Sequence, residues 1–229
     1  MQTVALSLRA GDGTPEVRPA VADVEVHGLW AGYGAGDVLQ DFELVVKPGE
    51  TVRLAGRNGS GKSTLLSCLA GSHTPRAGTI LVHRISLLDF PVEAKRNVGM
   101  STGSCPFPYL TGREHLAVAL RAYDLRAERV EALLQRFDGW ESVRSLDLEV
   151  RTYSHGMRQQ LSLLLAVAHD PAVLLLDEAT DGLDKESQAD WSRFLDDRAA
   201  AGGTLLYVAH KDGVASGFPE GRVVRVTRG

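Results

Sequence analysis

The chain has 229 residues, of which 44% are hydrophobic and 24% are charged, and its formal net charge at pH 7 is -4. This balance is typical of a folded globular protein, so the disordered and fibrous classes are excluded. A slightly acidic chain also lacks the overall positive field that attracts a polyanion, so we expect no nucleic-acid partner.

The first predicted elements are short β-type runs that follow an irregular segment. Residues 1–22 mix glycine, proline, threonine and charges without a period, and we expect them to be an N-terminal extension to a domain that covers residues 23–229. The runs DVEVHGLW, VLQDFELVV and TVRLAG are separated by the turn signals GYGAGD and KPGE. They predict that the domain opens with an antiparallel β subdomain.

The rest of the chain alternates between helix and strand patterns. A glycine-rich turn passes into a helical pattern at 56–71, and the run AGTILVHR returns to strand periodicity. Leucine and valine at helical spacing predict amphipathic helices at about 111–138, within an inserted helical subdomain at approximately 100–165. After Ser154 we expect a helix, the buried strand AVLLLDE, a helix at about 185–201 and the strand GTLLYVAH. This order predicts an α/β fold with a parallel sheet.

The cysteines and the apolar runs exclude further classes. Cys68 and Cys105 lie in no CxxC or Cys/His pattern, so we expect neither a zinc site nor a disulfide framework, and a reducing compartment. The apolar runs LSLLLAVA and AVLLL are far shorter than the roughly 18 to 20 residues of a membrane-spanning helix. The first residues lack a charged region before an apolar core, so we expect no signal peptide.

The strongest motif is GRNGSGKS at 56–63, which matches GxxxxGK[ST] and stands between a predicted strand and a predicted helix. In such a loop the backbone N–H groups turn inward around an anion, and the N-terminus of the following helix adds partial positive charge. Lys62 is placed to reach the β- and γ-phosphates of a nucleotide, and the Ser63 hydroxyl to ligate Mg²⁺. The predicted nucleotide contacts are Arg57, Asn58, Gly59, Ser60, Gly61, Lys62, Ser63 and Thr64.

A second candidate group is the acidic pair at the end of AVLLLDE. Open α/β sheets bind ligands at the carboxyl ends of their strands, where Asp177 and Glu178 are expected to lie. Asp177 is then a metal ligand, directly or through water, and Glu178 orients and deprotonates the attacking water. These residues and the loop predict ATP and Mg²⁺ as cofactors. The alternative for the pair alone is an ordinary strand end with solvated acids.

From about Asp23 onward the chain resembles the ATP-binding subunit of an ABC transporter. YSHGMRQQ at 153–160 resembles the signature motif of that family, and LLLDEAT with DGLD resembles its Walker B and D-loop pair. His210 in YVAHKD resembles the switch histidine. The resemblance implies an ABC-type P-loop NTPase fold of the α/β class, with an antiparallel β subdomain and an inserted helical subdomain. It also implies that the chain is an ATPase with Lys62, Glu178 and His210 as catalytic residues.

The family pairs two ATP-binding subunits head to tail, which implies further contacts with nucleotide. Ser154, Gly156 and Met157 would then contact the γ-phosphate bound by the other subunit, and Asp184 would lie on the same dimer seam. Whether the dimer is formed by two copies of this chain or with a related subunit stays open. Tyr33 resembles the aromatic residue that stacks on adenine, with Trp30 as the competing candidate.

Two departures from the family pattern stand out. The family usually places a glutamine in the segment VGMSTGSCPFPYLTGREHL, where this chain has Thr102 or Gly103. A small polar pair before an LTxRE-like sequence resembles exporter-type subunits, so this loop favours export. His155 replaces the first glycine of the signature, which alters the approach to a phosphate on the partner subunit.

We therefore predict an ATP-hydrolysing subunit that dimerises on ATP and powers a separate membrane-spanning permease, located peripherally at the cytoplasmic face of the cell membrane. The alternatives are a soluble ABC ATPase that drives a cytosolic assembly step and a small-molecule P-loop kinase, which would need neither YSHGMRQQ nor DGLD. The loop CPFPYL at 105–110 is apolar. It either docks a short helix of the permease or folds back so that Phe107 and Tyr109 pack into the helical subdomain.

Overall fold

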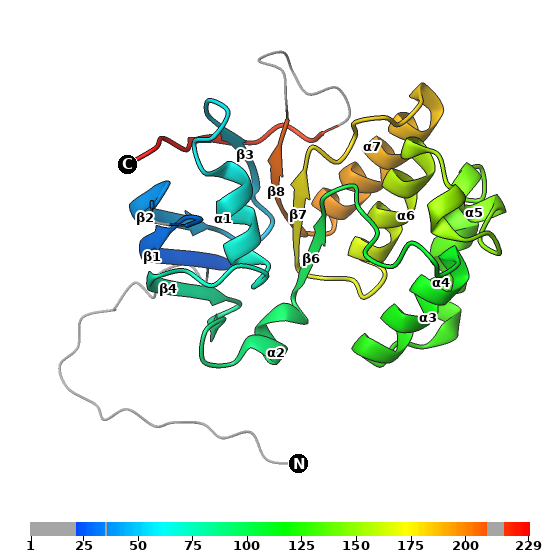
Figure 1. Cartoon of the computed structure of the whole chain (residues 1–229), viewed down its shortest axis with the longest axis horizontal. Coiled ribbons are helices and arrows are strands. Elements are labelled where there is room, and N and C mark those ends of the chain that lie inside the picture. Colours follow the sequence, from blue (N-terminus) through cyan, green and yellow to red (C-terminus); the bar gives the residue numbers. More distant parts are fainter. Residues whose placement is uncertain (1–21, 35, 210–217) are drawn as a thin grey trace.

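The computed structural model describes residues 22–34, 36–209 and 218–229, which form two sheets and a group of helices (Figure 1). The antiparallel sheet has the order β2-β1-β4-β5 and consists of β1 (Val24–Ala31), β2 (Leu39–Val46), β4 (Ala77–Val82) and β5 (Ile85–Ser86). The parallel sheet has the order β6-β7-β8-β3-β9 and consists of β3 (Thr51–Ala55), β6 (Val98–Ser101), β7 (Val173–Asp177), β8 (Thr204–Val208) and β9 (Arg222–Arg225). The predicted antiparallel and parallel sheets are both present. The run TVRLAG, predicted to belong to the antiparallel subdomain, instead forms β3 of the parallel sheet, where it pairs with β8 and β9.

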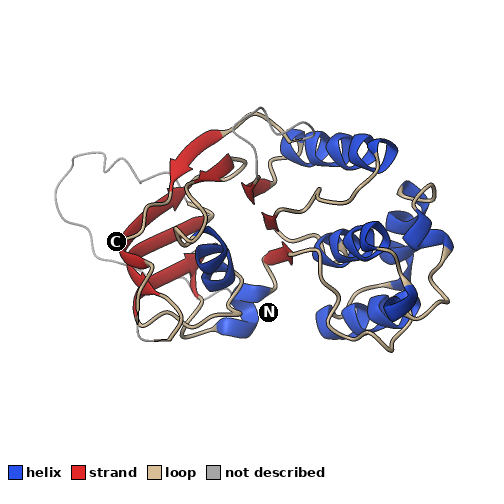
Figure 2. Cartoon of the chain, turned by 45° about the horizontal axis from the view of Figure 1, so that its top comes forward, coloured by secondary structure: helices blue, strands red, loops and turns tan. Residues whose placement is uncertain are grey.

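The antiparallel sheet forms because its strands alternate buried apolar residues with exposed polar ones. In β1, Val24, Val26 and Leu29 are fully buried, whereas His27 is exposed. The inward residues join one core with α1 (Lys62–Leu69), whose Leu66 is also fully buried. Helix α1 packs against both β1 and β7, so the phosphate-loop helix is held between the two sheets (Figure 2).

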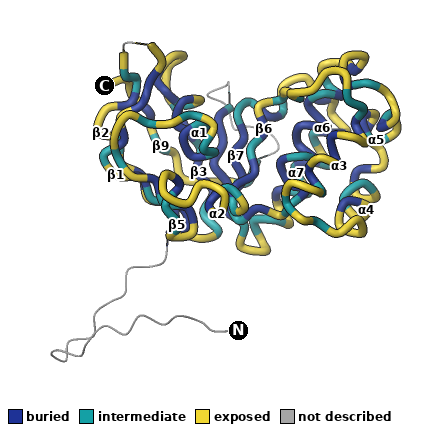
Figure 3. The backbone as a smooth tube through the Cα atoms, turned by 60° about the horizontal axis from the view of Figure 1, so that its bottom comes forward, coloured by how far each residue is buried: buried dark blue, intermediate teal, exposed yellow. Residues whose placement is uncertain are grey.

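Strands β7 and β8 of the parallel sheet are buried, except at Asp177, the last residue of β7. The side chains of β7 from Val173 to Leu176 and those of β8 from Thr204 to Val208 are all buried, as expected for strands covered on both faces (Figure 3). Strand β3 pairs with β8 and β9, and β7 pairs with β6 and β8, all in parallel register. The carboxyl ends of β3 and β7 therefore lie at the same edge of the sheet, where the two predicted motifs follow them.

Five helices lie to the right of the parallel sheet in Figure 1. They are α3 (Gly112–Tyr123), α4 (Ala127–Arg136), α5 (Glu141–Arg144), α6 (His155–Val167) and α7 (Lys185–Ala200), with a 3₁₀ turn (Val150–Thr152) before α6. The short α2 (Pro91–Lys95) precedes β6 and lies below the sheets in the same view. Helix α6 packs against β6, α3 and α5. The aromatic side chains of Phe137, Trp140 and Trp191 join α4, α5 and α7 into a second core.

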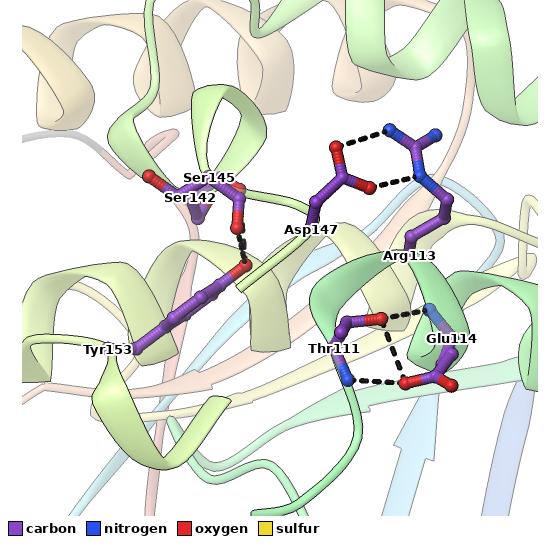
Figure 4. Close-up of polar contacts among 7 residues, drawn as sticks. All are labelled: Thr111, Arg113, Glu114, Ser142, Ser145, Asp147 and Tyr153. Atoms are coloured by element: carbon purple, nitrogen blue, oxygen red, sulfur yellow. Dashed lines mark hydrogen bonds and ion pairs between the residues drawn. The ribbon is translucent and has the colours of Figure 1, made fainter. Parts of the chain in front are cut away.

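Helix α3 begins with a capping box that the sequence analysis did not identify (Figure 4). The backbone N–H of Glu114 donates to Oγ1 of Thr111, and the backbone N–H of Thr111 donates to Oε2 of Glu114. Because the Glu114 carboxylate accepts from both the backbone N–H and the hydroxyl of Thr111, its pKa is lowered from the ordinary value. Arg113 on the same turn bonds both carboxylate oxygens of Asp147. These contacts fix where α3 begins, directly after the loop at 102–110.

Candidate nucleotide-binding site

The glycine-rich loop lies between β3 and α1, as predicted from the sequence. Helix α1 begins at Lys62, and Gly61 at its N-cap has a left-handed φ of 105°. A Cβ at Gly61 would lie 2.8 Å from Cδ2 of Leu39, so both the conformation and the space require glycine. Arg57, Asn58, Gly59 and Ser63 are exposed, whereas Ser60 and Thr64 are buried. The first turn of α1 is therefore open to an anion.

The Lys62 side chain folds back over the loop that precedes it. Its Nζ donates to the carbonyl oxygens of Gly56 at 2.9 Å and Arg57 at 3.1 Å. A hydrogen bond between two charged groups is stronger than one to a neutral carbonyl, so a phosphate is the better partner for this ammonium group. The geometry places Lys62 to exchange backbone oxygens for phosphate oxygens when a nucleotide binds.

The loop also forms one wall of a cavity of about 790 Å³. Residues 55–60 line one side and residues 225–228 the other, and the backbone N–H of Val226 donates to the carbonyl oxygen of Ala55 at 2.7 Å. Arg225 and Arg228, both exposed, are thus brought beside the phosphate loop. The sequence analysis missed them because VVRVTRG carries no motif, and its only signal is a short β-type run.

Asp177 ends β7 at the edge of the sheet where the loop lies. Its Oδ1 is buried and has no hydrogen-bond partner in the described part of the chain. A buried carboxylate oxygen without a donor is suited to a cation, so Asp177 fits the predicted Mg²⁺. Among the described residues no three His, Cys, Asp or Glu side chains gather as a metal cluster. A Mg²⁺ ion here would accordingly depend on Asp177, Ser63, water and phosphate oxygens rather than on a protein cage.

Glu178 follows the strand in an uncommon backbone conformation. Its φ is 56°, in the left-handed region, and its side chain is half-buried. The Glu178 N–H donates to the carbonyl oxygen of Val208 at 3.2 Å, and its own carbonyl accepts from the N–H of Asp181 at 3.1 Å. A non-glycine residue held this way costs on the order of 1–3 kcal/mol and is found at functional sites. The surrounding contacts therefore fix the direction in which the Glu178 carboxylate leaves the strand.

The predicted signature and D-loop residues lie together. Ser154 caps α6 by accepting the N–H of Met157 at 3.1 Å, and Asp184 caps α7 by accepting the N–H of Ser187 at 2.8 Å. A Cβ at Gly156 would lie 2.8 Å from the carbonyl oxygen of Gly182, so the start of α6 packs directly on the D-loop. The Met157 side chain is buried, and only its backbone is available to a ligand.

The apolar positions of α6 form one largely buried face. Leu161, Leu164 and Ala168 are buried, whereas Leu165 is only partly so. At the entry to this helix the buried Tyr153 hydroxyl donates to the carbonyl oxygen of Ser145 at 2.8 Å, and burial raises its pKa to about 12 (Figure 4). Tyr153 therefore stays a neutral hydrogen-bond donor and anchors the signature segment to the end of α5.

Tyr33 lies in the turn between β1 and β2 and leaves 64% of its surface exposed. Its ring centroid is 4.6 Å from that of His73, and the same turn leads to Val38 and Leu39, which contact the position of Gly61. Trp30 is 38% exposed at the end of β1. The Tyr33 ring is therefore largely exposed, and its ring contact is with His73, which follows the C-terminal end of α1.

Two further predictions concern the switch histidine and the apolar loop before α3. His210 lies outside the described residues. In the loop at 102–110, Phe107 is 50% exposed and Tyr109 is 75% exposed, so they are not packed into the helical core. The phenol of Tyr109 lies 5.7 Å from the guanidinium of Arg151. Tyr109 is thus presented at the surface, whereas the half-exposed Phe107 also lies against the ring of His115 on α3, with a centroid distance of 5.9 Å.

The two thiols take no part in this site. Burial raises the pKa of Cys68 to about 12 and that of Cys105 to about 11. Burial therefore disfavours the reactive thiolate form of both residues near neutral pH. No helix in the described residues is long and apolar enough to span a bilayer.

Residues 39–181 match a family model described as ABC transporter. The chain is 30% identical over 175 residues to the ABC transporter ATP-binding protein NatA of Bacillus subtilis, which is 75% of this chain and 71% of that protein. It is 34% identical over 199 residues to the Nod factor export ATP-binding protein I of Burkholderia orbicola, which is 83% of this chain and 64% of that protein.

A solved structure described as the ATP-binding subunit of an ABC transporter superposes with a TM-score of 0.81 at 30% sequence identity. The superposition covers 89% of this chain and 85% of that chain, which confirms the predicted P-loop α/β fold with its antiparallel sheet. The chain spans between 33% and 64% of the length of several other curated relatives. Their names include importers as well as exporters.

Proposed function

This chain belongs to the family of ABC transporter ATP-binding proteins and is an ATPase of that class, and we propose that it dimerises on ATP to power a separate membrane-spanning permease. Lys62 and the loop amides hold the β- and γ-phosphates, and Ser63 and Asp177 hold the Mg²⁺ that neutralises charge on them. Glu178 deprotonates the attacking water, and His210 hydrogen-bonds the γ-phosphate. Tyr33 stacks on the adenine.

The placement of the capped start of α6 carries the dimer proposal. Ser154 and Gly156 lie at the N-terminus of α6, which packs against the D-loop. The phosphate loop lies at the N-terminus of α1, on the other side of β7 (Figure 1). One chain therefore has two helix N-termini suited to an anion, and they lie at separate positions on its surface. A second ATP-binding subunit in head-to-tail orientation brings the two surfaces onto one nucleotide, with Asp184 on the same seam.

A variant that binds ATP without hydrolysing it should accumulate as the dimer. We expect the Glu178→Gln chain, which keeps the shape of the side chain but loses the base, to double from 24.7 kDa in light scattering when MgATP is added. A second substitution, Lys62→Ala, should return it to a monomer. A Glu178→Gln chain that stays monomeric with bound ATP would exclude the homodimer and leave pairing with a related subunit. A small-molecule kinase would show no change of oligomeric state.

The exposed Phe107 and Tyr109 are the proposed docking site for the permease. They lie directly before α3, whose first turn carries the exposed charged side chains of Arg113 and Glu114. An apolar patch with a polar rim suits a short helix of a membrane protein. This partner would hold the chain at the cytoplasmic face of the membrane. We propose export as the direction, on the small polar pair Thr102–Gly103 before LTGRE.

Substitution of the first docking residue tests this surface. We expect Phe107→Ala to lower recovery of the permease by about tenfold or more, because an aromatic anchor carries a large share of interface energy, and to leave ATP binding unchanged. Val118→Ala is the matched control, since Val118 is an equally exposed apolar residue on α3. Unchanged recovery with Phe107→Ala would remove this loop from the interface. A soluble assembly ATPase, the alternative function, would recover no permease with any variant.

A further inference from the structure

Gln159 occupies a buried position between the turn that follows Glu178 and the loop at 102–105. It lies on α6 one turn after the capped start of the helix, and only 2% of its surface is exposed. Its Nε2 donates to the carbonyl oxygen of Ala179 at 2.6 Å. A carbonyl oxygen only accepts, so this contact fixes which end of the amide carries the nitrogen. The amide oxygen must then point the other way.

The amide oxygen of Gln159 lies against Gly103. A Cβ at Gly103 would come within 2.0 Å of Oε1, and Gly103 has a left-handed φ of 72°. Both the conformation and the contact therefore demand glycine at this position. A single side chain thus fills the space between the backbone of the 102–105 loop and the backbone that follows Glu178.

The contact with Ala179 bears on catalysis because Ala179 directly follows Glu178, the proposed base. Glu178 is held at φ 56°, and Ala179 is fully buried directly after it. A left-handed non-glycine residue persists only where the surrounding structure fixes it on both sides. The bond from the Glu178 N–H to Val208 fixes the strand side, and the bond from Gln159 fixes the other side.

We propose that Gln159 is a positioning residue, which aims the Glu178 carboxylate at the attacking water and makes that aim depend on the place of the 102–105 loop. The inference rests on the proposed role of Glu178 as the base. The rate of hydrolysis falls steeply when a base is displaced by about 1 Å, whereas ATP binding by the phosphate loop does not depend on it. The 102–105 segment, which leads into the proposed docking residues Phe107 and Tyr109, is thereby joined to the backbone after Glu178 through one amide.

The test is a split between turnover and binding. Gln159→Met keeps the volume of the side chain but removes the donor, and we expect kcat to fall by about tenfold or more while the Kd for ATP stays unchanged. Gly103→Ala presses on the same amide from the other side and should lower kcat in the same way. Gln159→Glu can donate only when protonated, so its kcat relative to the unsubstituted chain should rise as the pH is lowered.

Thr204→Val is the matched control for a lost buried hydrogen bond. Thr204 is fully buried at the start of β8, and its hydroxyl donates to Oδ2 of Asp23 at 2.5 Å. This substitution should lower the melting temperature and leave kcat unchanged. A Gln159→Met chain with normal kcat, or a Gln159→Glu chain whose relative kcat is independent of pH, would overturn the inference. Normal hydrolysis by Glu178→Gln would instead overturn the proposed role of Glu178 as the base, on which the inference rests, so the two failures are distinguishable.

Discussion

Glu178→Gln should reduce kcat for ATP hydrolysis by about 10²- to 10⁴-fold, the range that a positioned general base contributes. The amide has the size of the carboxylate and cannot accept the proton of the attacking water. The fixed backbone of Glu178, with its N–H on the carbonyl oxygen of Val208, is unchanged by this substitution. Phosphate release from MgATP under saturating conditions measures the effect.

Binding of ATP should survive the same substitution, because the phosphates are held by the loop and Lys62 rather than by Glu178. Glu131→Gln is the matched control, since Glu131 is an exposed acid on α4 in the helical region. It should hydrolyse ATP at the normal rate. A kcat for Glu178→Gln within about twofold of the unsubstituted chain would show that another group takes the proton.

Trp191→Ala is expected to lower the free energy of unfolding by about 3–5 kcal/mol, the usual cost of removing a large aromatic side chain from a core. Trp191 is fully buried on α7 between Trp140 and Phe194, with centroid distances of 6.2 and 5.1 Å. The neighbouring Phe137 and Trp140 are themselves buried in the same cluster, so we expect much of the space to stay unfilled. Urea unfolding followed by circular dichroism measures the loss.

Trp191→Phe separates packing from hydrogen bonding at this position. The indole Nε1 of Trp191 is buried without a hydrogen-bond partner in the described part of the chain, so phenylalanine removes no bond. The cost should be clearly smaller than that of Trp191→Ala. An alanine variant that loses less than about 1 kcal/mol would mean that the helices rearrange to fill the cavity.

The sequence predicts the sheets and the phosphate site well because these depend on local patterns. The phosphate loop needs small residues at fixed spacing and a following helix, and the structure places Lys62 and Ser63 at the start of α1 as expected. Strand β7 is a continuous apolar run, which favours a strand covered on both faces. Ser154 and Asp184 are good N-cap residues, and both cap the helices that follow them.

Contacts between distant segments escape this kind of prediction. Arg228 reaches the phosphate loop only because β9 pairs with β3, and nothing within VVRVTRG indicates that pairing. The exposure of Phe107 and Tyr109 depends on how α3 is capped and seated, so the sequence left two alternatives open. The contact of Gln159 with Ala179 likewise joins a helix to a turn 20 residues away in the chain.

Recovery of the partner from membranes tests the central claim most directly. The tagged chain would be extracted from high-salt-washed membranes of its native host in mild detergent with ATP, and the proteins bound to it identified and quantified. We predict a multi-spanning membrane protein at a near one-to-one ratio, with Phe107→Ala losing it. Recovery of soluble proteins alone, with the chain absent from the washed membranes, would contradict the account and favour the soluble ATPase.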